Sequence, residues 1–86
     1  MYKHQELTDK VIKAFYSVYT VLDYGFLEKI YENAMMIELA KMNILAVAQS
    51  PIHVFYDGNL VGEYLTDILI ENCVIVEIKA TKKFDP

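Results

Sequence analysis

The 86-residue chain lacks arginine and tryptophan, and it contains three glycines, two prolines and one cysteine. Without arginine it has no guanidinium fork for bidentate binding of phosphate or guanine, so sequence-specific reading of bases is not expected. A lone Cys73 excludes a disulfide within the chain. Three glycines are too few for a glycine-rich phosphate loop, and one cysteine with two distant histidines gives no zinc-ligand spacing.

The sequence also lacks a long apolar run and an apolar signal-peptide core at its start. No run approaches the roughly 18 residues of a membrane span, so we expect a cytoplasmic protein. The net charge of −4 argues against a protein that coats DNA, because phosphate binding depends on basic side chains. It does not exclude a nuclease, whose active-site carboxylates contribute to the negative count.

Composition and hydrophobic periodicity predict one small globular domain over residues 1–86. Apolar residues recur at spacings of three and four in the first half, whereas runs rich in Ile, Val, Phe and Tyr fill the second half. The predicted fold class is therefore α+β, with two N-terminal helices followed by a three-stranded antiparallel meander. The helices are expected over about residues 5–22 and 26–42, and the strands over about 44–56, 60–70 and 74–80.

Local signals refine these elements. Thr8 and Asp9 are candidate caps of the first helix, unless it begins earlier, and Gly25 is a candidate terminator. Asp57-Gly58 and Asn72 mark the two hairpin turns. The expected buried stripe of the first helix is Leu7, Val11, Ala14, Phe15, Val18 and Leu22. That of the second is Leu27, Ile30, Ala34, Ile37 and Lys41, with Tyr31 and Glu38 beside it.

Two of the predicted strands carry charges that a core strand would not. In the third strand, Glu77 and Lys79 share one face with Ile75, while the other face is wholly apolar. In the second strand, Asp67 is the only charge in residues 64–70, and aspartate is depleted in strands. Charges inside apolar stretches are costly unless they are paired or bind a metal.

This set of residue types suits phosphodiester cleavage. Mg²⁺ or Mn²⁺ takes hard oxygen ligands, which Asp67 and Glu77 could supply, with Glu28 of the second helix as a further ligand. Lys79 could orient the attacking water or neutralise developing charge. The ordinary alternatives are a solvated ion pair for Glu77 and Lys79, a structural hydrogen bond for Asp67 and a surface position for Glu28. Other acidic residues are expected at the surface or in support of the site, with Glu63 able to assist metal binding: Glu32, Glu38 and Glu63.

A shared metal requires Asp67 and Glu77 to lie on the same face of the sheet. Direct pairing of residue 67 with residue 77 sets residue 70 opposite residue 74 and leaves residues 71–73 as a three-residue turn. A two-residue turn would shift the register by one and place the two carboxylates on opposite faces.

The segment from Gly25 to Tyr31 matches the Gly-x-x-Glu-x-x-Tyr signature of the GxxExxY protein family. Residues 32–34, 61–64 and 74–80 also look like its pattern, so the resemblance covers roughly residues 5–83. That family resembles the PD-(D/E)XK nuclease superfamily, which implies a restriction-endonuclease-like core and metal-dependent cleavage of nucleic acid. Residue by residue, the resemblance places four candidate catalytic residues: Glu28 on the first core helix, Asp67 on the second strand, and Glu77 and Lys79 on the third.

Members of that family usually continue into a further helix and strand, whereas this sequence stops seven residues after Lys79. The expected core is a shortened αβββ unit instead of αβββαβ. Two functions follow: a Mg²⁺- or Mn²⁺-dependent nuclease acting on DNA or RNA, and a catalytically inactive, nuclease-derived interaction module. An uncovered sheet exposes apolar surface and a strand edge, so we expect a two-fold homo-oligomer that packs through residues 60–80 or the first helix.

Overall fold

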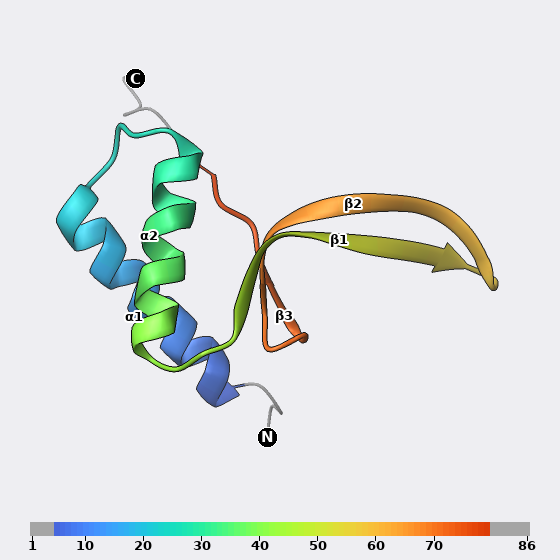
Figure 1. The fold of residues 1–86 in the computed structure, drawn as a ribbon, viewed down its shortest axis with the longest axis horizontal. Helices are drawn as coiled ribbons and strands as arrows, with labels where there is room; N and C mark the ends of the chain where they lie inside the picture. The colour runs from blue at the N-terminus through green and yellow to red at the C-terminus, as the bar shows by residue number, and fades with distance from the viewer. Residues whose placement is uncertain (1–4, 80–86) are drawn as a thin grey trace.

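A computed structural model describes residues 5–79, in which two helices precede a three-stranded antiparallel sheet. The helices pack together beside one end of the sheet, and the β1–β2 hairpin extends away from them (Figure 1). This arrangement confirms the α+β prediction. In chain order the elements are α1 (Gln5–Leu22), α2 (Glu28–Lys41), β1 (Ala46–Tyr56), β2 (Asn59–Ile70) and β3 (Val74–Val76). Within residues 5–79 neither helix has the length and apolar character needed to span a membrane.

Helix α1 buries nearly the stripe that its periodicity predicts. Val11, Ala14 and Val18 are buried, but Phe15 is 47% exposed because it lies at the margin of the stripe. The described part of the helix begins at Gln5, so Thr8 and Asp9 lie inside it and do not cap it.

The end of α1 differs from the expectation of a glycine terminator. The backbone N–H of Asp23 donates to the carbonyl of Tyr19 at 2.8 Å, and Asp23 itself takes the left-handed conformation with φ of 61°. Gly25 lies two residues further on, in the loop between the helices, with φ of 108°. An L side chain is strained at that angle, which is why the loop requires glycine there.

The predicted buried stripe of α2 is wrong. Leu27, Ile30 and Ile37 are exposed, whereas the buried residues are Tyr31, Glu32, Met35 and Leu39. Apolar side chains are spread around α2, so its sequence does not favour one face. Tertiary packing determines which face of α2 is buried, because α1 and the sheet contact the side that carries the large Met35 and Leu39.

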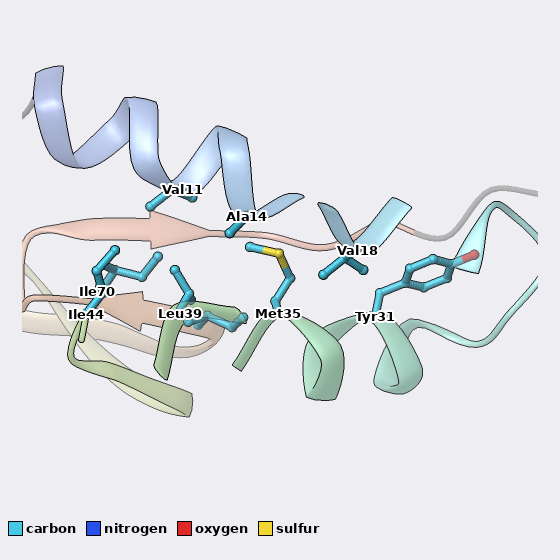
Figure 2. Packing of buried hydrophobic residues seen from close by; sticks show 9 residues of the cluster. Val11, Ala14, Val18, Tyr31, Met35, Leu39, Ile44 and Ile70 are labelled. Atoms are coloured by element: carbon cyan, nitrogen blue, oxygen red, sulfur yellow. The ribbon is translucent and has the colours of Figure 1, made fainter. Parts of the chain in front are cut away.

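The core lies between the two helices and the inner end of the sheet. Residues of α1 face residues of α2, and Ile44 and Ile70 close one end of the cluster (Figure 2). Met35 is 2% exposed, and Leu39 and Ile68 are fully buried. Met35 is thus a core residue. The cluster consists of Val11, Ala14, Val18, Tyr31, Met35, Leu39, Ile44, Ile68 and Ile70.

Both predicted turns of the meander form. Asp57 and Gly58 have φ of 53° and 78°, the two consecutive positive values that the central residues of a tight two-residue hairpin turn require. Asn72 has φ of 58°. The β2–β3 ladder pairs Ile70 with Val74, which leaves residues 71–73 as the turn and confirms the predicted register.

Strand β3 is shorter than predicted. It ends at Val76 instead of running through residue 79, and Ala80 lies outside the described residues. The backbone N–H of Ile78 donates to the side-chain Oδ2 of Asp67 at 2.6 Å. The ladder therefore stops at the Ile68–Val76 pair, and a side-chain hydrogen bond on β2 holds the chain after it.

Candidate functional site

Asp67 lies on β2 at the point where β3 stops pairing. The last ladder pair is Ile68 with Val76, so the same register sets Asp67 opposite Glu77. Asp67 is half-buried and alternates with buried Thr66 and Ile68, so its side chain lies on the face of β2 opposite to theirs.

Residues 77–79 keep the alternation of a strand although they leave the ladder. Ile78 is half-buried and packs against the core, whereas Glu77 and Lys79 are exposed. The charge-assisted bond from Ile78 to Asp67 holds this segment against β2. If the alternation of β3 is extended, Glu77 and Lys79 fall on the same side as Asp67, and both residues also line the cleft beside α1.

Glu28 is the first residue of α2 and is exposed. It lies one helical turn before Glu32 and seven residues before Met35, so it continues the side of α2 that packs inward. The chain that leaves β3 runs toward this end of α2 in both views (Figures 1 and 2). Glu28 and the segment 77–79 thus occupy the same end of the fold.

A divalent ion needs oxygen ligands that can converge. Within residues 5–79, no three His, Cys, Asp or Glu side chains gather closely enough to hold a metal ion. Glu28, Asp67 and Glu77 are therefore not assembled into one cluster. The pair Asp67 and Glu77 still fits Mg²⁺, since that ion usually takes one or two carboxylates together with waters and substrate phosphate.

Glu32, which the sequence predicts at the surface or in support of the site, is a buried carboxylate. It is 3% exposed, and it lies 3.1 Å from Nζ of Lys29. The side-chain amide of Gln49 donates to both its oxygens, at 2.7 and 3.3 Å. These partners satisfy a charge that would otherwise be costly to bury. The sequence could have indicated this burial only through helical spacing, which puts Glu32 on the same side of α2 as Glu28 and Met35.

Gln49 ties α2 to the sheet across from the candidate site. It has φ of 54°, a left-handed value that breaks the regular pleat of β1. The flanking ladder pairs, Ala48 with Ile68 and Ser50 with Thr66, set Gln49 across from Asp67. The Glu32–Gln49 contact therefore fixes α2 beside the strand region that carries Asp67. No local sequence pattern indicates this role for Gln49.

Tyr31 organises the loop that leads into α2. Its hydroxyl donates to the carbonyl of Asp23 at 2.6 Å and accepts from the backbone N–H of Phe26 at 3.3 Å. Its ring is buried, as expected for a core residue. With Gly25 in its positive φ, Tyr31 fixes the chain just before Glu28. The Gly-x-x-Glu-x-x-Tyr spacing thus has a physical role: it positions the start of α2.

Tyr31→Phe tests the contribution of this hydroxyl to stability. We expect the free energy of unfolding to fall by about 1–2 kcal/mol, because the Asp23 carbonyl and the Phe26 N–H both lose a partner. The same change at Tyr24, which is 44% exposed, is expected to cost less than about 0.5 kcal/mol. Urea unfolding monitored by circular dichroism measures both. Equal effects of the two variants would contradict the proposed role of Tyr31.

The remaining charged candidates lie in surface pairs. Nε2 of His53 lies 3.2 Å from Glu63 on the β1–β2 hairpin, where both side chains are more than half exposed. Glu63 therefore pairs with His53 and not with Asp67. This contact gives no support to the suggested role of Glu63 in metal binding. Glu38 lies 3.2 Å from Lys41 on α2. Such exposed pairs contribute little to stability.

Comparison with known proteins places the chain in a family. Residues 5–86 match the family model described as the PD-(D/E)XK nuclease superfamily. No curated protein and no solved structure gives a significant match to the chain.

Proposed function

Because the chain belongs to the PD-(D/E)XK nuclease superfamily, we propose that it is a metal-dependent nuclease that hydrolyses phosphodiester bonds in DNA or RNA. One observation carries the proposal. The β2–β3 register, extended one residue past the last ladder pair, supports a position of Asp67 across from Glu77, with Lys79 two residues further along the chain. The motif from Gly25 to Tyr31 supports a finer assignment to the GxxExxY family.

Each candidate residue has a distinct role in this proposal. Asp67 and Glu77 are the metal ligands, and Glu28 at the start of α2 is the third carboxylate. When bound, Mg²⁺ or Mn²⁺ lowers the pKa of a coordinated water and offsets the negative charge of the phosphate. Lys79 provides a positive charge on the same side, which orients the water or stabilises charge that develops on the phosphate.

The proposed substrate is nucleic acid that the chain binds without reading its sequence. No arginine is present, so contacts of a guanidinium fork with guanine or phosphate are excluded. The net charge of −4 supplies little long-range attraction to phosphate. Binding then depends on the divalent ion and on the few lysines near the site.

The alternative is a catalytically inactive interaction module derived from a nuclease. The apolar β1–β2 hairpin favours it, because eight large apolar side chains there are exposed. Metal binding separates the two candidates, since a module that acts only through protein contacts does not need the ion.

Calorimetric titration with Mn²⁺ and Mg²⁺ tests the nuclease proposal. We expect saturable binding by the native chain and its loss in Asp67→Asn, which removes the charge but keeps an oxygen to accept from Ile78. Glu63→Gln is the matched control, since that carboxylate pairs with His53 on the hairpin. In the presence of Mn²⁺, the native chain and Glu63→Gln should cleave plasmid and oligonucleotide, whereas Asp67→Asn should not.

Two results would contradict the proposal. Binding that survives Asp67→Asn would place the ion elsewhere. A native chain that neither binds Mn²⁺ at millimolar concentration nor cleaves either substrate would favour the interaction module.

A further inference from the structure

Two energetically unfavourable features meet where α2 packs beside β1. Glu32 is a carboxylate only 3% exposed, and a charge taken out of water must be compensated. Gln49 holds a left-handed φ of 54° within β1, a strained conformation for a residue with a side chain. The side-chain amide of Gln49 donates to Oε1 of Glu32 at 2.7 Å, which joins the two features. The proposed mechanism gives neither residue a role, although such strain concentrates at functional sites.

The left-handed conformation brings the side chain of Gln49 to the helix. Side chains alternate along β1, and the half-buried neighbours Ala48 and Ser50 lie on one face. Regular alternation would direct Gln49 to the opposite face, together with Asp67 across the ladder. The left-handed φ breaks this alternation, and the amide instead binds Glu32 of α2. The strain at Gln49 therefore accompanies a contact between the sheet and the helix.

Gln49 holds Glu32 from another element of the fold. Lys29, whose Nζ lies 3.1 Å from Oε2 of Glu32, belongs to α2 itself and does not fix the helix relative to the sheet. Glu32 lies one turn after Glu28, on the same side of α2. The bond from Gln49 therefore connects the helix side that carries Glu28 with the strand position across from Asp67.

We propose that Gln49 is a positioning residue of the metal site, which acts through Glu32 to set the approach of Glu28 to Asp67. This inference rests on the proposed nuclease function. Within residues 5–79 no three His, Cys, Asp or Glu side chains gather closely enough to hold an ion. The affinity for the ion then depends on how firmly the elements that carry its ligands are held together, and it falls when the supporting contacts are lost.

Gln49→Gly tests the side chain without disturbing the backbone. Glycine adopts the left-handed conformation without strain, so the variant keeps the path of β1 and loses only the bond to Glu32. We expect the dissociation constant for Mn²⁺, measured by calorimetric titration, to rise about tenfold. In cleavage of an oligonucleotide, kcat should fall while KM changes less than about twofold, because the surface that binds nucleic acid is unchanged.

Asn43→Gly is the matched control. Asn43 also has a left-handed φ, 59°, and it lies beyond the end of α2 that is remote from Glu28. The same substitution there should leave the dissociation constant for Mn²⁺ within about twofold of the native value, because distant sites act independently.

Glu32→Gln separates support of the site from direct binding of the ion. Glutamine keeps an oxygen that accepts from the amide of Gln49 but removes the charge. A supporting role predicts a dissociation constant for Mn²⁺ within about threefold of the native value, since the bond between α2 and β1 remains. Loss of Mn²⁺ binding in this variant would identify Glu32 as a ligand and overturn the proposal.

Mn²⁺ binding that is unchanged in Gln49→Gly would also overturn the positioning role, and it would leave the nuclease proposal intact. A native chain that binds no Mn²⁺ would instead contradict the nuclease proposal and this inference with it. Circular dichroism checks that each variant folds. If Gln49→Gly does not fold, Gln49→Asn takes its place, because asparagine tolerates the same φ and is one methylene shorter. It should weaken Mn²⁺ binding in the same way.

Discussion

Glu77→Gln is expected to abolish metal binding and to lower any cleavage of nucleic acid by more than about a hundredfold. Glutamine keeps the size of the side chain but removes the anionic oxygens that Mg²⁺ requires. Partners outside the immediate ligands already cost up to about a hundredfold when removed, so a direct ligand should cost at least as much. Calorimetry with Mn²⁺ and oligonucleotide cleavage measure the two effects.

The same substitution should leave the fold intact. Glu77 is exposed, so the free energy of unfolding is expected to change by less than about 0.5 kcal/mol. A small gain is expected without metal, because one of two facing carboxylates is gone. Glu6→Gln, with a side chain 90% exposed on α1, is the control for a general effect of lost charge. Unfolding of Glu77→Gln would instead identify Glu77 as a structural ion-pair partner.

Leu39→Ala is expected to have the largest effect on stability. Leu39 is fully buried in α2, and its truncation leaves a cavity that costs about 2–5 kcal/mol. A domain of this size has little stability in reserve, so the variant should be mostly unfolded near 37 °C. Urea or thermal unfolding followed by circular dichroism measures the change.

Ile37→Ala is the matched control, because Ile37 is 62% exposed two residues away on the same helix. We expect it to cost less than about 1 kcal/mol in the monomer. This pair decides which face of α2 is buried. If Ile37→Ala lowered the free energy of unfolding more than Leu39→Ala, the buried face of α2 would be the one that periodicity alone predicts.

The sequence alone determines the local features of this fold. Asp57-Gly58 and Asn72 take positive φ with little strain, so the two hairpin turns form at these residues. The length of the second turn then sets the register, and with it the placement of Asp67 across from Glu77. The register of the second hairpin was therefore predictable from turn chemistry and the period of two.

The interior of the first helix was also predictable. Val11, Ala14 and Val18 form one stripe at a spacing of three and four, with polar residues on most of the opposite side. In such a helix the apolar stripe and the buried face coincide. Phe15, at the margin of the stripe, is the position where the prediction failed.

Only the tertiary structure decided which side of α2 is buried and how its charges are satisfied. Apolar side chains surround that helix, so packing against α1 and the sheet selected Leu39 over Ile37. That packing buried Glu32 and gave it Gln49 as a partner from β1, seventeen residues away. Likewise β3 ends at Val76 because Asp67 captures the N–H of Ile78. Local sequence governs turns and periodicity, but the satisfaction of buried polar groups depends on contacts between residues far apart in the chain.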